Sequence, residues 1–312
     1  MLSPVQERTL VELMGSRDER PVFRRSLRED LLGELERRVA PAVERLPPER
    51  SLWVTKARLT DLHLRCEGLF VANELDEAPF DYSMPLAIGN LVHRTIEAGV
   101  SAPDRSEAEL VDAALIHLRR DDPRFDAFVS DLPVVERADL EAEAVRQVVL
   151  FRATFPPLQR SWTPAVEVPL KAEVAEGRVV LYARPDLCLG SADPDEPMRA
   201  RRLIVELKTG TERPEHDEDL RFYALAATLR LGVPPFRVAT LLLGSGTWRV
   251  HDVTEDLLRG AVRRIGDGCV RAAALLAGER PSLRPGPWCR WCPRAQTCPA
   301  SSVRGAGGDA RE

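Results

Sequence analysis

The sequence predicts an α/β protein. In the second half of the chain, short apolar runs typical of strands alternate with longer segments of helical periodicity. The order is three strands, a helix, two strands and a long amphipathic helix, which is typical of a sheet covered by helices. The strand-like runs lie at residues 163–174, 178–189, 203–209, 236–244 and 247–253, and the helix-like segments at 215–231 and 254–278.

The composition is that of a soluble globular protein. The chain has 312 residues, of which 44% are hydrophobic and 30% charged, enough for one large domain or two small ones. The net charge of −5 gives no overall basic excess that would by itself indicate nucleic acid as a partner. No apolar run approaches the ~20 residues of a membrane span, and the N-terminus does not resemble a secretory signal. We therefore expect a cytoplasmic protein without membrane contact, whose six cysteines are thiols or metal ligands.

The first 75 residues predict helices. Residues 1–50 are rich in Arg, Glu and Leu, and they predict two charged helices that break near Pro41 and at Pro47–Pro48. Within residues 55–75, Thr60 or Asp61 could cap a helix that places Cys66 on its apolar side. Taken alone, this cysteine suits an ordinary core position, since a free cysteine behaves as a small buried hydrophobe.

Residues 85–100 predict a helix that carries His93. Gly89 lies one turn earlier and would let another backbone or a ligand approach that turn closely. A single histidine on such a helix also suits a hydrogen-bonded core position. The segment 101–157 predicts further helices, which we interpret as a helical insertion before the strands.

The strands carry one group of charges that suits catalysis. The first two runs predict a β-hairpin with its turn at Glu176–Gly177, and Asp186 lies in the second arm. The next strand ends with Glu206 and Lys208, which point to the same face because they are two residues apart. Two carboxylates and a lysine on neighbouring strands suit a divalent cation such as Mg²⁺ and an activated water, as in phosphodiester hydrolysis. The alternative is a surface ion pair at the end of a strand.

The second group is a set of cysteines in a C-terminal tail rich in Pro, Trp and Arg. Cys289, Cys292 and Cys298 have the spacing of metal or cluster ligands, and Cys66 is the best candidate for a fourth. The tail arginines, with Trp288 and Trp291 among them, suit phosphate contacts and base stacking, or the tryptophans pack around the metal centre. The two remaining cysteines, interpreted as interior thiols, are Cys188 and Cys269.

These motifs, taken together, carry a resemblance to a family. The chain resembles the RecB-like nucleases of the PD-(D/E)XK superfamily, in particular the iron–sulfur subgroup that includes CRISPR-associated exonucleases and the nuclease domains of AddB-type helicase–nucleases. The resemblance covers about residues 55 to 300. The matching positions are Gly89-x-x-x-His93, Pro185-Asp186, Glu206-x-Lys208, Tyr223, Cys66, Cys289, Cys292 and Cys298.

The resemblance implies a restriction-endonuclease-like core with a central mixed β-sheet flanked by helices. It implies that His93, Asp186 and Glu206 bind Mg²⁺ or Mn²⁺ with the backbone carbonyl of Leu207, and that Lys208 is catalytic. Asp186, Glu206 and Tyr223 also belong to the implied catalytic set. A 4Fe–4S cluster would join Cys66 to the three tail cysteines, and Zn²⁺ at the same cysteines is the alternative.

The implied activity is that of a metal-dependent deoxyribonuclease acting on single-stranded or end-bearing DNA. The sequence has no G-x-x-x-x-G-K-[ST] loop, so DNA unwinding would need a separate helicase. One departure from the family pattern is Asp219, where the family has Gln four residues before the tyrosine; an acid there would add to the metal site or repel the phosphate. The alternative function is a non-catalytic DNA-binding or scaffolding subunit of a DNA repair or antiviral defence complex.

The expected domain organisation follows from these assignments. We expect an N-terminal helical segment and one nuclease domain, with the helical insertion inside it and a cluster-binding tail at its end. The boundaries are 1–50 for the helical segment, 51–300 for the nuclease domain, about 101–157 for the insertion, about 281–300 for the tail and 301–312 for a disordered terminus.

Overall fold

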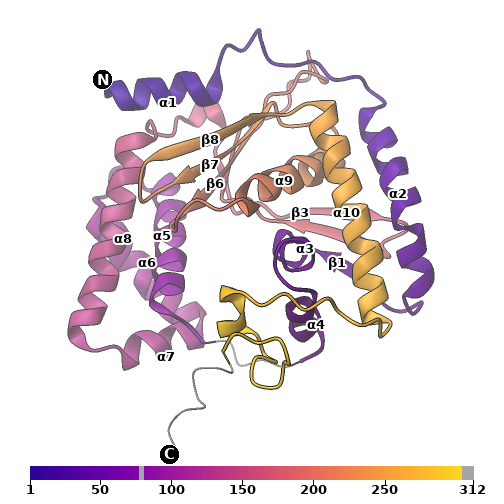
Figure 1. Cartoon of the computed structure of the whole chain (residues 1–312). Coiled ribbons are helices and arrows are strands. Elements are labelled where there is room, and N and C mark those ends of the chain that lie inside the picture. Colours follow the sequence, from indigo (N-terminus) through magenta and orange to yellow (C-terminus); the bar gives the residue numbers. More distant parts are fainter. Residues whose placement is uncertain (77–80, 304–312) are drawn as a thin grey trace, which may run out of the picture. The chain divides into compact units, whose positions relative to one another are not determined.

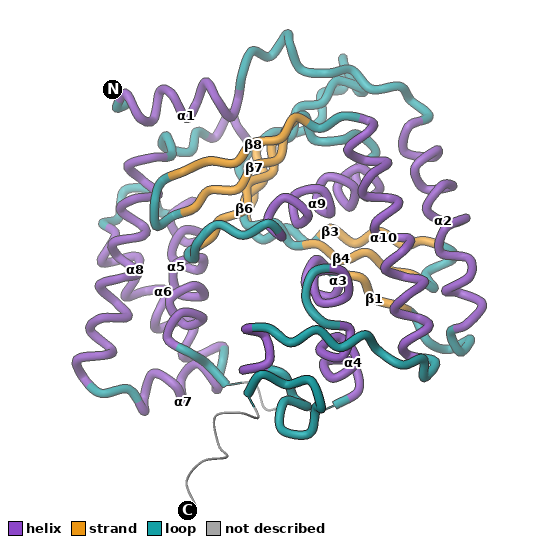
Figure 2. Tube along the Cα trace, viewed as in Figure 1, coloured by secondary structure: helices purple, strands orange, loops and turns teal. Residues whose placement is uncertain are grey.

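The computed structural model describes residues 1–76 and 81–303, and these residues form a mixed α/β fold (Figure 1). They contain ten α-helices and eight strands, and the strands form two mixed sheets (Figure 2). The α/β class predicted from the sequence is therefore confirmed. The chain divides into two compact units, each assembled from three separate segments.

Unit 1 comprises residues 1–25, 81–169 and 184–254. In it, α5, α6 and α8 pack side by side, and their apolar faces share one core with the five-stranded sheet. Phe125, Leu140 and Leu207 are among the buried residues of this core. The helices of the unit are α1 (Pro4–Met14), α5 (Met84–Ser101), α6 (Glu107–Asp121), α7 (Pro123–Asp131), α8 (Val134–Thr154) and α9 (Glu215–Leu231).

The five-stranded sheet has the order β2-β5-β6-β7-β8. The central strand β6 runs parallel to β7 and antiparallel to β5, and every residue of β6 except Lys208 is buried. Five buried residues in succession are typical of a strand that is covered on both faces. The strands are β2 (Ala165–Val166), β5 (Leu187–Leu189), β6 (Leu203–Lys208), β7 (Arg237–Leu242) and β8 (Thr247–Asp252).

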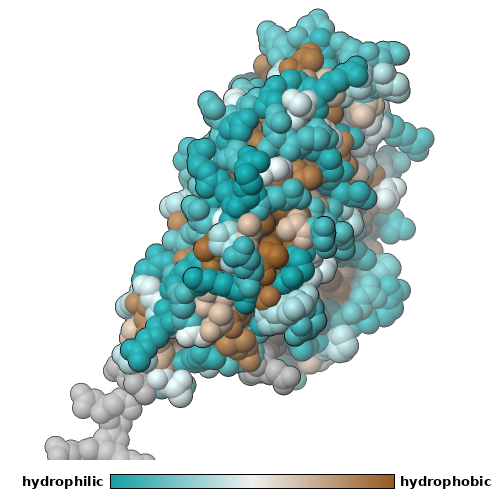
Figure 3. Space-filling view, turned by 90° about the vertical axis from the view of Figure 1, so that its right-hand side faces the viewer, coloured by the Kyte–Doolittle hydropathy of each residue, from teal (hydrophilic) through white to brown (hydrophobic). Residues whose placement is uncertain are grey.

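Unit 2 comprises residues 26–76, 170–183 and 255–303. Its three-stranded sheet has the order β1-β4-β3, with β1 parallel and β3 antiparallel to β4. The long helices α2 and α10 pack against each other. The face of the molecule shown in Figure 3 is largely hydrophilic, with scattered apolar residues. The elements are α2 (Leu27–Arg45), β1 (Leu52–Val54), α3 (Lys56–His63), α4 (Glu67–Leu75), β3 (Leu170–Val174), β4 (Val179–Ala183) and α10 (Glu255–Leu276).

The predicted hairpin is present as β3 and β4, but its two arms are not continuous strands. Each arm is interrupted, at 167–169 and at 184–186, and the parts on either side of the interruption belong to different sheets. Pro169 and Pro185 have no backbone N–H to donate to a strand ladder, and Glu167 has a φ of +51°. The strand pairs on both sides of the interruption keep one register, in which Glu167 lies opposite Asp186, and the Glu167 N–H donates to the Asp186 carbonyl at 3.2 Å.

Two helix predictions were wrong in detail. The helix α2 continues through Pro41, since its apolar residues keep their spacing to Ala42 and pack as one face. Thr60 and Asp61, the predicted caps of one helix, lie inside α3, and a second helix, α4, follows with Cys66 as its capping residue. None of the described helices is long and apolar enough to cross a membrane. The disordered terminus predicted at 301–312 lies, from residue 304 onward, outside the described residues.

Candidate active site

The end of β6 presents the predicted acid and base side by side. The Lys208 ammonium donates to Glu206 Oε1 at 2.8 Å, as expected for residues on one face of a strand. The Glu206 side chain is almost fully buried and that of Lys208 is one-fifth exposed. An ion pair with so little solvent around it is not the exposed surface pair that was the alternative at this position.

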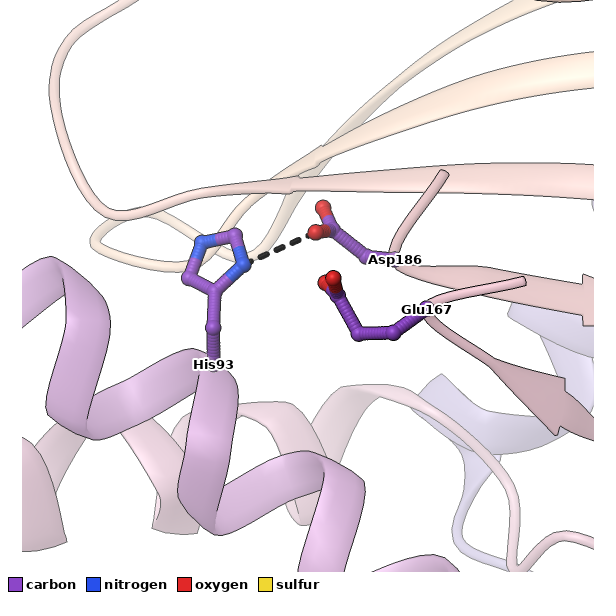
Figure 4. Close-up of side chains that lie close together, drawn as sticks. All are labelled: His93, Glu167 and Asp186. Carbon is purple, nitrogen blue, oxygen red and sulfur yellow. Dashed lines mark hydrogen bonds and ion pairs between the residues drawn. The ribbon is translucent and has the colours of Figure 1, made fainter. Parts of the chain in front are cut away.

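Asp186 connects three elements of unit 1. Its Oδ1 lies 2.9 Å from Nδ1 of His93 on α5 (Figure 4). Its Oδ2 accepts a hydrogen bond from the Leu207 N–H at 2.6 Å. A Cβ at Gly89, one turn before His93, would lie 3.3 Å from the Thr209 hydroxyl, so this turn of α5 does lie close to the end of β6. Leu207 contacts Asp186 through its backbone N–H. The resemblance implied a different role for this residue, with its backbone carbonyl as a metal ligand.

Glu167 is a member of the site that the sequence reasoning missed. Its carboxylate points toward the His93 ring and the Asp186 carboxylate, and the ligand atoms of the three residues lie within 4.8 Å of one another (Figure 4). The available signal was a glutamate in the first arm of the hairpin, two residues before a proline. The hairpin register was a second signal, because the strand pairs on both sides of the interruption share one register, and with the predicted turn at Glu176–Gly177 this register sets Glu167 opposite Asp186.

Burial and the charges of the site shift the pKa values of Glu167, His93 and Lys208. Burial raises the pKa of Glu167 to about 7, and the nearby charge of Asp186 adds to this effect. Burial opposes the charged form of His93, but the charges of Asp186 and Glu206 outweigh it and raise the pKa of the ring. Burial likewise opposes the charged form of Lys208, and the carboxylates of Glu206 and Asp219 outweigh it, so its pKa is raised.

Helix α9 adds two groups to the end of β6. Asp219 Oδ2 accepts a hydrogen bond from the Lys208 ammonium at 3.2 Å. One turn later the Tyr223 hydroxyl forms a hydrogen bond with Glu206, and burial together with the charge of Glu206 raises the pKa of the phenol well above its usual value. Tyr223, predicted from the sequence, is therefore brought into contact with the predicted carboxylate.

The residues around Asp186 fit a hard divalent cation. Ligand atoms at about 2.1 Å from one octahedral ion are roughly 3 Å apart when adjacent and about 4 Å apart when opposite. His93, Glu167 and Asp186 offer one nitrogen and two carboxylates within 4.8 Å of one another, which is close to these separations. The predicted ligand Glu206 is not a member of this compact group, although its charge acts on the pKa of His93.

In unit 2, the four cysteines of the predicted metal centre line one cavity. Cys66, Cys289, Cys292 and Cys298 face a space of about 240 Å³. Burial raises the pKa of Cys292, and the charges of the other three cysteines raise it further, whereas hydrogen bonds from the backbone at Gly286 and Ser302 lower the pKa of Cys289. The structure thus gathers residues that are separated by more than two hundred positions in the chain.

Comparison with known proteins identifies the family. The model of the PD-(D/E)XK nuclease superfamily matches residues 59–299. The chain belongs to the PD-(D/E)XK nuclease superfamily. Its mixed α/β architecture is consistent with the restriction-endonuclease-like fold of that superfamily.

A solved structure from Eubacterium rectale, of a protein to which an exonuclease activity is ascribed, is similar with a TM-score of 0.46 and 12% sequence identity. The similarity covers 83% of this chain and 90% of the other chain. No curated protein matches the sequence significantly.

In this nuclease the tail is held to α4 by contacts of the protein itself. Both carboxylate oxygens of Glu67 accept hydrogen bonds from Arg271, at 2.8 and 2.6 Å, and one of them also accepts the Ser282 N–H at 2.6 Å. Arg294 forms a second bidentate pair, with Asp76. Charge-assisted bidentate pairs fix geometry more firmly than single hydrogen bonds. These contacts position Cys66 opposite the tail cysteines.

Glu67→Gln is expected to loosen the tail. Removing the charge weakens the pair with Arg271, which we value at about 1–2 kcal/mol, so the tail should open roughly tenfold more often. The measurement is the rate of limited proteolysis within residues 279–300 under native conditions. The matched control is Glu49→Gln, which changes an exposed glutamate of the same unit. Equal cleavage rates in Glu67→Gln and the wild type would show that these contacts do not hold the tail.

Glu167→Gln is expected to weaken Mn²⁺ binding by about 10- to 100-fold, because it removes one carboxylate of the compact group. In EDTA the variant should be at least as heat-stable as the wild type at pH 8, since it no longer places two negative charges side by side. Calorimetric titration with Mn²⁺ and thermal unfolding measure the two effects. Glu136→Gln, an exposed position on α8, is the control. Unchanged Mn²⁺ affinity in Glu167→Gln would exclude Glu167 from the metal site.

Proposed function

We propose that the protein is a metal-dependent DNA nuclease of the RecB-like group that hydrolyses phosphodiester bonds with Mg²⁺ or Mn²⁺. The observation that carries the proposal is the convergence of His93, Glu167 and Asp186 on one point of unit 1. Glu206 and Lys208 lie beside these three residues, because the N–H of Leu207, which stands between them in β6, donates a hydrogen bond to Asp186. A histidine, three acids and a lysine gathered around the end of one buried strand would be costly in a purely structural core.

A divalent cation, when bound, lowers the pKa of a coordinated water and neutralises charge that develops on the phosphate. In this proposal His93, Glu167 and Asp186 bind the cation, and Glu206 is a further ligand. The Leu207 N–H orients the Asp186 carboxylate, and Tyr223 orients that of Glu206. Lys208 provides an ammonium that stabilises negative charge in the transition state.

We further propose that the cysteine cavity of unit 2 holds a structural 4Fe–4S cluster. Four thiolates around one Zn²⁺ would be about 3.8 Å apart, given a Zn–S distance of about 2.3 Å. Among the described residues the cysteines do not form a group within 4.8 Å, and their cavity of about 240 Å³ is larger than one ion needs. Iron and zinc content after anaerobic purification tests the assignment: bound iron with a brown colour supports it, and stoichiometric zinc without iron contradicts it.

DNA is the proposed substrate, and the tail is proposed to contribute to binding it. Trp288 lines the cysteine cavity, which favours a packing role for this residue. Trp291 is 55% exposed and follows the exposed Arg290, a combination that suits base stacking beside a phosphate contact. A separate helicase would provide any unwinding of duplex DNA.

The experiment that tests the function is a cleavage assay on single-stranded, blunt-ended and flapped DNA with Mg²⁺ and with Mn²⁺, beside Glu206→Ala. Cleavage by the wild type with a divalent ion, lost in Glu206→Ala, is the expected result. Failure of the wild type to cut any of these substrates with either ion would contradict the proposal and favour a non-catalytic DNA-binding or scaffolding role.

A further inference from the structure

Lys208 is an unusual residue in this chain. Only three of the 44 basic residues are lysines, namely Lys56, Lys171 and Lys208, so the chain uses arginine almost everywhere else. The Lys208 ammonium lies between two carboxylates, 2.8 Å from Glu206 Oε1 and 3.2 Å from Asp219 Oδ2. The Asp219 side chain is 9% exposed. A compact ammonium in this place donates to two carboxylates that lie in different directions, an arrangement that a planar guanidinium would not fit.

The spacing of α9 matches that of β6. Residues four apart on a helix are separated by about 6 Å along its axis, and residues two apart on a strand by about 6.6 Å. Asp219 and Tyr223 are four apart on α9, which packs along β6 and β7 (Figure 1). Glu206 and Lys208 are two apart on β6. Each residue of the helix pair therefore meets one residue of the strand pair, Asp219 with Lys208 and Tyr223 with Glu206.

We propose that Asp219 is a positioning residue, whose carboxylate, together with that of Glu206, fixes the Lys208 ammonium at the edge of the metal site. This rests on the proposed nuclease function. The sequence suggested that an acid at this position would either add to the metal site or repel the phosphate. Asp219 does not belong to the compact metal-ligand group of the described residues, and its carboxylate accepts a hydrogen bond from the Lys208 ammonium. Neither of the two consequences is therefore needed.

The first test observes Lys208 directly in the full-length protein without substrate. With ¹³C-labelled lysine the protein gives signals of three residues, and that of Lys208 is assigned by its loss in Lys208→Ala. In the wild type the two ε-protons of a fixed side chain should have separate signals. In Asp219→Ala they should merge, because the side chain gains freedom. In Asp219→Asn, which keeps a hydrogen-bond acceptor of the same shape, an intermediate separation is expected.

The second test is kinetic. A displacement of a catalytic group by about 1 Å costs roughly 100-fold in rate. Asp219→Ala should therefore lower kcat by about 100-fold, Asp219→Asn by less, and KM should change by no more than about threefold in either. Mn²⁺ affinity should stay unchanged in both. The control is Asp217→Asn, which removes a charge on the same helix that pairs with His251 and does not contact Lys208; its kcat and Lys208 signals should equal those of the wild type.

Three results would overturn the inference. Lys208 signals that are identical in Asp219→Ala and the wild type would show that Asp219 does not fix the lysine. A tenfold or larger loss of Mn²⁺ affinity would make Asp219 a metal ligand, and a change in KM alone would make it a substrate contact. A wild type that shows separate ε-proton signals but cuts no DNA would refute the nuclease function while leaving the positioning of Lys208 by Asp219 in place.

Discussion

An Asp186→Asn protein is expected to cleave DNA at least about a thousandfold more slowly than the wild type, a loss of about 4 kcal/mol of transition-state stabilisation. Asp186 contacts His93 with one oxygen and the Leu207 N–H with the other, and it lies beside Glu167. The amide keeps the size of the side chain but removes the negative charge that a divalent cation needs. The measurement is the single-turnover cleavage rate at saturating Mn²⁺.

The control for this variant is Asp195→Asn, an exposed aspartate in the loop before β6, whose rate should equal that of the wild type. Thermal unfolding in EDTA checks that Asp186→Asn is folded. A rate within about tenfold of the wild type would contradict the assignment of Asp186 to the metal site.

The second large effect is expected for Cys292→Ser. Serine is a poor ligand for iron, so the variant should lose the visible absorbance of the cluster and most of its bound iron. A group that binds only the folded state stabilises it, and its loss should lower the unfolding temperature by roughly 5 °C or more. Proteolysis within the tail should become faster, because the tail is then held only by pairs such as Glu67–Arg271 and Asp76–Arg294.

Cys188→Ala is the matched control for the cysteine prediction. Cys188 lies in β5 of unit 1, and burial raises its pKa to about 12, as expected for an interior thiol. Removing it should leave iron content unchanged. If Cys292→Ser keeps its iron and its unfolding temperature, the cluster assignment fails.

Much of the site could be predicted because its chemistry is concentrated in short sequence patterns. Glu206 and Lys208 come together through the period of a single strand, which a sequence shows directly. His93 and Asp186 are 93 residues apart and were connected by resemblance, and the structure brings them to 2.9 Å. The four cysteines were likewise connected by resemblance, and the structure places Cys66 in one cavity with the three cysteines of the tail.

Glu167 could have been found from the hairpin, since the predicted turn at Glu176–Gly177 and the register of β3 and β4 set it opposite Asp186. The contact of Asp219 could not be predicted in this way. The role of Asp219 depends on the packing of α9 against β6, which aligns a helix repeat with a strand repeat. This alignment is a property of tertiary packing, and neither local propensity nor motif spacing contains that information.

The central claim is that DNA cleavage by this protein requires a divalent cation bound at His93, Glu167 and Asp186. The most direct measurement is a Mn²⁺ titration in which bound ion, by electron paramagnetic resonance, and cleavage rate are followed in the same samples of wild type and Asp186→Asn. In the wild type both should rise together and both should be absent in EDTA, and in Asp186→Asn neither should appear at the same Mn²⁺ concentrations. Cleavage in EDTA, or equal binding and cleavage by Asp186→Asn, would contradict the claim.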